Sequence, residues 1–96
     1  MTIMIIGICT CEIYIFNANS LKSKRSVVKS IIEKSKNRFN ISIAEVGEHD
    51  KWQKSIIAFS TISNDQRLVE ETIEKVINFF DSYSEIEIIN IKREIL

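Results

Sequence analysis

The strongest constraint on the fold is an alternation of side chains that runs through residues 3–16. The odd positions are apolar or glycine throughout, whereas the even positions become polar in the second half of the segment. A period of two is typical of a β-strand with one buried face. We therefore predict a long first strand, with its odd side chains in the core and its even side chains on the outer face.

Two segments have the spacing of amphipathic helices. Residues 21–38 place apolar side chains on one side of a helix, after turn formers that supply an N-cap at Asn19 or Ser20. Residues 68–80 repeat the pattern, and a capping box is predicted to begin at Ser63. Each helix is expected to cover a sheet with its apolar stripe.

Three shorter segments complete the set of predicted strands: residues 39–46, 55–62 and 86–92. The first is expected to bulge or change face near its end, where Ala44 and Val46 break the alternation. The resulting order, β-α-β-β-α-β, predicts an α+β ferredoxin-like sandwich. Its four-stranded antiparallel sheet, of order 4-1-3-2, would carry both helices on one face.

Composition places the chain among folded domains. Its 96 residues are 45% hydrophobic and 27% charged, with no proline and two glycines, so we expect one ferredoxin-like domain over residues 1–96. No apolar run approaches the roughly 20 residues of a membrane helix, and the apolar start lacks the basic region of a signal peptide. We therefore expect a cytoplasmic protein with no membrane partner.

Few residues indicate catalytic or metal chemistry. Cys9 and Cys11 point the same way on the predicted strand, so we interpret them as buried core thiols rather than a metal or redox pair. His49, the only histidine, lies in a charged loop that contains no cysteine or second histidine to help bind a metal. The sequence also has no phosphate-binding loop or nucleophile motif. It therefore predicts no enzyme, no cofactor and no small-molecule substrate.

A basic run lies in a chain whose formal net charge is zero. Residues 21–54 carry nine basic and four acidic side chains, whereas residues 55–96 carry four basic and eight acidic ones. A helical wheel places four of the basic side chains within about 60° of one another. This basic ridge consists of Lys22, Arg25, Lys29 and Lys36. It is either a site for an anionic partner or a solvated helix face.

Aromatic side chains give two weaker signals. Tyr14 and Phe16 would lie on the open sheet face, as in half of the signature of an RNA-recognition motif. On the third strand, however, Ile56 and Ala58 occupy the stacking positions, so we do not assign that motif. Trp52 could stack on a base or dock a partner, although a staple that closes one end of the core is the favoured interpretation.

The outer face of the predicted sheet is apolar at one end. In an antiparallel pair, the start of the first strand lies beside the end of the third. The side chains expected to form a homodimer interface on this face are Met4, Ile6, Ile8, Ile56 and Ile62. An apolar patch on a one-sided sheet favours the association of two copies.

Four strings of the sequence resemble the YlxP-like family, small bacterial proteins classed as a domain of unknown function: SLKSKRSVVKSI, NRFNISIAEVGEHDKWQKS, SNDQRLVEETIEKV and IKREIL. The resemblance covers nearly the whole chain. It implies a ferredoxin-like fold and a gene often found beside those of translation-initiation and ribosome-maturation factors, with no established enzymatic activity. The chain departs from the family pattern at Phe16, Asn17 and Asn19, where we would expect a proline, a glycine and a basic residue.

Together these features predict a non-enzymatic RNA-binding or ribosome-associated accessory protein, with ribosomal RNA or ribosomal proteins as partners. The residues expected to contact nucleic acid are Lys22, Lys24, Arg25, Lys29, Lys36, Arg38, Lys51, Trp52 and Lys54. The alternative is a homo-oligomeric protein-interaction module with no nucleic-acid role, whose basic ridge meets an acidic protein.

Overall fold

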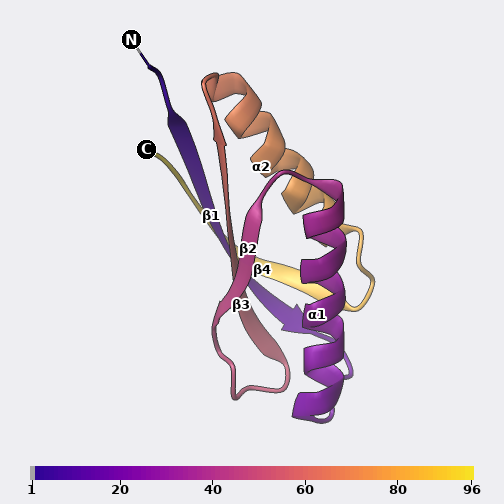
Figure 1. The fold of residues 1–96 in the computed structure, drawn as a ribbon. Coiled ribbons are helices and arrows are strands. Elements are labelled where there is room, and N and C mark those ends of the chain that lie inside the picture. The colour runs from indigo at the N-terminus through magenta and orange to yellow at the C-terminus, as the bar shows by residue number, and fades with distance from the viewer. Residues whose placement is uncertain (1) are drawn as a thin grey trace.

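The computed structural model describes residues 2–96 and confirms the predicted order of elements. The elements are β1 (Ile5–Ile15), α1 (Leu21–Arg38), β2 (Ser42–Gly47), β3 (Lys54–Ser63), α2 (Gln66–Asp81) and β4 (Ile86–Ile95). The antiparallel strands are hydrogen-bonded in the order β2-β3-β1-β4, which is the predicted order 4-1-3-2. Both helices lie on one face of this open sheet (Figure 1). The fold is therefore the predicted α+β sandwich.

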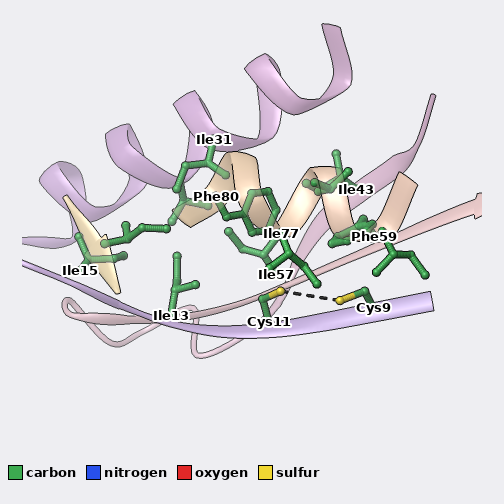
Figure 2. Close-up of a cluster of buried hydrophobic side chains, with 14 of the residues drawn as sticks. Cys9, Cys11, Ile13, Ile15, Ile31, Ile43, Ile57, Phe59, Ile77 and Phe80 are labelled. Carbon is green, nitrogen blue, oxygen red and sulfur yellow. Dashed lines mark hydrogen bonds between the residues drawn. The ribbon is translucent and has the colours of Figure 1, made fainter. Parts of the chain in front are cut away.

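The inner face of the sheet, the one that the helices cover, carries the core. The odd side chains of β1 from Cys9 to Ile15 are fully buried, whereas the even ones are only partly buried. Phe59 of β3 meets Phe80 of α2 edge to face, with ring centroids 5.8 Å apart. Ile31 of α1 packs onto the same cluster (Figure 2). The alternation in β1 thus separates a core face from an outer face, as predicted.

Gly7 allows α2 to approach β1 closely. A Cβ atom at this position would lie 2.5 Å from Val69 Cγ1 and 2.8 Å from Ile73 Cδ1. Both distances are shorter than van der Waals contact, so any larger side chain would push against the helix. The backbone φ of Gly7 is not positive, so the glycine is needed for space rather than for a left-handed conformation.

The observed N-cap agrees with the sequence-based prediction at α1 and differs from it at α2. Ser20, one of the two predicted options, caps α1 with its Oγ, which accepts a hydrogen bond from the first turn at 3.1 Å. The predicted capping box at Ser63 is wrong, because β3 stays extended through that residue and the helix begins three residues later. Asp65 is the N-cap instead, and its Oδ1 accepts a hydrogen bond from Arg67 N at 2.9 Å.

The strand boundaries differ from the predicted ones by a few residues. β2 begins only at Ser42, because Phe39 is still the C-cap of α1, with its N–H donating a hydrogen bond to the carbonyl oxygen of Ser35. The predicted irregularity near its end is confirmed by a register shift between Glu45 and Gly47. β4 runs to Ile95, three residues further than predicted, since its polar end still pairs with β1.

The molecule is elongated, with principal extents of 52 × 20 × 18 Å. The start of β1 and the end of β4 lie together at one end of the sheet (Figure 1). The β2–β3 and β1–α1 connections lie toward the opposite end, which we call the loop end of the sheet. No helix within residues 2–96 is long and apolar enough to cross a membrane.

Candidate nucleic-acid interface

The basic ridge lies on the side of α1 that faces away from α2. Its four members are all exposed to solvent: Lys22, Arg25, Lys29 and Lys36. Two basic side chains on the opposite side of the wheel face α2 and the connection that follows it. The Arg38 guanidinium lies 5.1 Å from the ring centroid of Phe79 in α2, and Lys34 Nζ lies 5.7 Å from that of Tyr83, just after α2. At 1.5 Å of rise per residue, the ridge extends for about 20 Å along the helix.

Ion pairing leaves most of the ridge charge available. Lys29 Nζ lies 4.0 Å from Glu33 Oε1, and both side chains are exposed. An exposed pair of this kind is weak and is screened by salt. Within residues 2–96, the other three ridge cations have no acidic partner within 4.0 Å. The ridge therefore presents a line of largely uncompensated positive charge.

The prediction that Lys24 contacts nucleic acid is wrong. Its side chain is fully buried, with Nζ 3.1 Å from Glu45 Oε2 and donating a hydrogen bond to the carbonyl oxygen of Glu48. Glu45 Oε2 also accepts a hydrogen bond from Ser55 Oγ at 2.6 Å. Because a buried ammonium group is stable only with such partners, the charge of Lys24 is committed to the interior and cannot reach a phosphate.

The helical spacing of Lys24 was the signal that predicts its burial. Lys24, Val28, Ile31 and Ser35 follow one another at intervals of four, three and four residues, which places them on one face of α1. All four are buried. A lysine in register with a buried stripe lays its aliphatic stem along apolar surface, so it belongs to the core-facing side despite its charge.

The buried Lys24 also fixes the start of the β2–β3 loop, residues 48–53. Glu48 has a φ of 61°, in the left-handed region, and its carbonyl oxygen accepts hydrogen bonds from both Lys24 Nζ and Lys51 N. The Lys51 and Glu48 side chains lie 4.0 Å apart. His49 Nε2 lies 4.0 Å from Glu45 Oε1, the carboxylate oxygen that does not contact Lys24. The loop is thus tied to α1 through a buried charge.

The remaining predicted contact residues lie in three different places. Lys51 and Trp52 are in the β2–β3 loop, next to the start of the ridge. Lys54 lies on the outer face of the sheet, paired in register with Tyr14. Arg38 lies over an aromatic ring beside α2, away from the ridge. The structure therefore brings the ridge and the loop together and leaves Arg38 apart.

Trp52 does not close the core as the favoured sequence interpretation expected. Its side chain is 53% exposed, although the flanking backbone is held in place. The next residue, Gln53, accepts a hydrogen bond on its carbonyl oxygen from Ile15 N at 2.9 Å. The alternative that the sequence left open, an exposed docking or stacking residue, is the one compatible with this exposure.

Cys9 and Cys11 are buried core thiols, as predicted. Both side chains are fully buried and free, and their Sγ atoms lie 3.8 Å apart (Figure 2). The hydrogen bond with Cys9, together with burial, raises the pKa of the Cys11 thiol. A neutral buried thiol packs as a small apolar side chain, so this pair contributes to the core.

The outer face carries an aliphatic row near the chain ends. Ile6 pairs in register with Ile62, and on its other side Ile6 exchanges two backbone hydrogen bonds with Leu96, at 2.8 and 3.4 Å. Met4, Ile62 and Leu96 are 62%, 53% and 61% exposed. The predicted interface members further along this face are half-buried: Ile8 and Ile56. Leu96 belongs to the row because β4 extends further than the sequence pattern indicates.

The fold and its exposed ridge define a small α+β protein of the open ferredoxin-like type. The family model for "Protein of unknown function (DUF503)" matches residues 6–93, and the chain belongs to this family. It is 40% identical over 82 residues to the "Uncharacterized protein YlxP" of Bacillus subtilis (strain 168), an alignment that covers 85% of this chain and 89% of the relative. These matches confirm the resemblance to the YlxP-like family.

Proposed function

We propose that this protein is a non-enzymatic RNA-binding accessory factor of the ribosome that acts in the cytoplasm. The observation that carries the proposal is the exposed basic ridge on α1, with three of its four cations free of acidic partners in the described part of the chain. An RNA backbone along this ridge would contact about four phosphates over about 20 Å. The gene neighbourhood implied by the family resemblance directs the proposal toward ribosomal RNA.

The distribution of acidic groups also supports an RNA site on the side of the molecule that carries the ridge. Most acidic side chains of the second half lie on α2 and on or beside β4. The ridge faces away from α2, so these carboxylates do not line it. A phosphate backbone would therefore meet positive charge on this side of α1 and repulsion on the side of α2.

Salt dependence tests the proposal. Each phosphate that a cation neutralises releases a condensed counterion, so the logarithm of RNA affinity should fall with the logarithm of salt concentration at a slope of roughly −3 to −3.5. Lys29→Gln should flatten that slope by nearly one unit and weaken all RNA sequences about equally, because phosphate contacts carry no sequence information. The matched control is Lys34→Gln, which removes a lysine that faces Tyr83 instead.

Two outcomes would contradict the ridge as an RNA site. One is equal behaviour of Lys29→Gln and Lys34→Gln in fluorescence anisotropy titrations, and the other is binding that does not change with salt. A pull-down from cell extract, with and without nuclease, tests the ribosomal part separately. Ribosomal RNA should be recovered with the protein, and nuclease should remove the ribosomal proteins that depend on it.

The aliphatic row on the outer face favours a second candidate, a homodimeric interaction module. Ile62 and Leu96 lie on either side of Ile6, and the exposed Met4 precedes Ile6 by two residues. A second copy related by a twofold axis would cover these apolar side chains. Ile6→Lys places a charge in this row and should convert the dimer to monomer in sedimentation velocity without unfolding it. A wild-type protein that stays monomeric at high micromolar concentration would rule out this candidate.

A further inference from the structure

Two exposed aromatic residues lie on neighbouring backbone segments at the loop end of the sheet. Among the eight aromatic residues, all within residues 2–96, only Phe16 and Trp52 are exposed, by 42% and 53%. Their backbones are neighbours, because Tyr14 pairs with Lys54 and Ile15 N bonds to the carbonyl oxygen of the residue after Trp52. The Tyr14 ring supports Phe16 edge to face, with centroids 5.3 Å apart.

The loop that carries Trp52 is anchored at both ends. At its start, the Glu48 carbonyl is held by the buried Lys24, and at its end the Gln53 carbonyl is held by Ile15 of β1. A ring on a segment that is already ordered loses little conformational entropy on binding. Exposed aromatic rings on an anchored backbone are thus arranged for a planar ligand.

Charge around these rings is divided between two sides. Tyr14 lies between Lys54 on β3 and Glu87 on β4. Lys24 ties the loop to the first turns of α1, which also carry Lys22 and Arg25 of the ridge. Cations therefore continue from the rings toward β3 and α1, whereas a carboxylate lies on the side of β4. A polyanion that stacks on the rings would run toward the ridge.

We propose that the loop end of the sheet binds unpaired bases of single-stranded RNA, with Phe16 and Trp52 as stacking residues and Lys24 as a positioning residue. This inference rests on the proposed function and specifies its class of RNA. Bases inside a duplex are already stacked and cannot reach the rings, whereas splayed bases stack on aromatic side chains. Stacking tolerates every base, and one base contributes roughly 5- to 150-fold to affinity.

The test compares a single-stranded RNA with a hairpin of equal length, closed by a short loop whose bases are themselves paired or stacked, so that it offers no splayed base. Trp52 is the only tryptophan, so its fluorescence reports directly on the loop. The single strand should quench this fluorescence and bind more tightly than the hairpin. Trp52→Leu should lower the affinity for the single strand by at least about fivefold and leave the affinity for the hairpin unchanged. Trp52→Phe should retain most of the affinity for the single strand. Leu68→Ala, at a 46% exposed position on α2, is the control and should change the affinity for neither RNA.

Lys24→Met tests the positioning role, because it removes the ammonium group and keeps an apolar stem. We expect lower anisotropy of Trp52 fluorescence and a reduced preference for the single strand. The salt slope should not change, since Lys24 contacts no phosphate. A variant that merely loosened the fold would lower the affinity for both RNAs alike, and this result would overturn the positioning role. If Lys24→Met does not fold, the base site is decided by Trp52→Leu.

The outcomes separate this proposal from the proposed function. Equal affinity for the single strand and the hairpin, with Lys29→Gln still flattening the salt slope, would overturn the base site and leave the ridge as an RNA site. The same conclusion would follow if the single strand did not quench the Trp52 fluorescence of the wild-type protein and if Trp52→Leu bound the single strand as tightly as the wild type. Absence of binding to either RNA would overturn both.

Discussion

The two faces of the sheet are built from alternate residues of the same strands, yet they differ in almost every property. On β1, Cys9 and Cys11 are fully buried under the helices, whereas Thr10 and Glu12 between them remain partly exposed. The inner face is mostly apolar and closely packed, and its two buried polar side chains on β3, Ser55 and Thr61, are both hydrogen-bonded. The outer face is aliphatic near the chain ends and aromatic at the loop end. This difference indicates that stability resides mainly on the inner face, that the outer face remains available for the contacts proposed above, and that substitutions can separate the two.

The largest effect on the inner side is expected from Lys24→Ala. Removing the ammonium group leaves the Glu45 carboxylate and the Glu48 carbonyl without their buried donor. Losing one partner of a buried ion pair is strongly destabilising, and because Glu45 is 17% exposed we expect a loss of about 2–4 kcal/mol in the free energy of unfolding. Urea denaturation followed by circular dichroism measures it.

Lys22→Ala, two residues away on the exposed ridge, is the control for Lys24→Ala. Its side chain has no ion-pair partner within 4.0 Å among the described residues, so the free energy of unfolding should change by no more than about 0.5 kcal/mol. Similar losses for the two variants would mean that the buried pair does not hold the fold. The comparison is direct, because both lysines lie in the first turn and a half of α1.

The next effect is expected from Gly7→Ala. The new Cβ would lie 2.5 Å from Val69 Cγ1, so the side chains of α2 that pack on β1, or the helix itself, must shift. Overpacking of this kind should lower the free energy of unfolding by about 2–3 kcal/mol. Gly47→Ala is the milder counterpart, since its Cβ would meet Ile56 Cδ1 at 3.0 Å. Thermal unfolding of both variants should rank Gly47→Ala as the more stable, and the reverse order would contradict the packing at Gly7.

A smaller loss is expected from Cys9→Ser, which places a hydroxyl group in the core. Without a good hydrogen-bond partner, the change should cost about 1–2 kcal/mol. The wild-type thiols should react slowly with iodoacetamide in the native state and rapidly in urea, because Cys9 and Cys11 are buried and the pKa of Cys11 is raised. Fast native labelling, measured by mass spectrometry, would show that the inner face opens.

The sequence predicts the inner face much better than the outer one, for a physical reason. Burial under two helices imposes a period of two on β1 and a period of 3.6 on the helices, so the core residues follow from the pattern. The order of the elements then indicates the ferredoxin-like sandwich and its strand order. Lys24 is an exception, because its charge indicates an exposed side chain whereas its helical spacing indicates a buried one. Its partner Glu45 comes from a different element, and only the folded chain brings the two together.

The outer face imposes no such pattern, and its contacts depend on where strands end. The membership of Leu96 in the aliphatic row depends on the length of β4, whose last residues have no apolar alternation to mark them. The proximity of Trp52 to Phe16 depends on the register between β1 and β3. Pairing register is a long-range property, so composition and local propensity do not determine it.

The smallest effect is expected from Ile62→Thr on the outer face. Ile62 is 53% exposed, and threonine is also β-branched, so the strand keeps its preferred conformation and loses little buried area. The free energy of unfolding should change by no more than about 0.5 kcal/mol at low protein concentration, where any dimer is dissociated. The same substitution at Ile57, fully buried on the same strand, should cost at least about 2 kcal/mol, because it buries an unpaired hydroxyl group. If the aliphatic row joins two copies, Ile62→Thr should in addition weaken the dimer in sedimentation velocity, while Ile57→Thr should not do so before it unfolds the chain. Equal losses of stability at the two positions would mean that the outer face is as much a part of the folded core as the inner one.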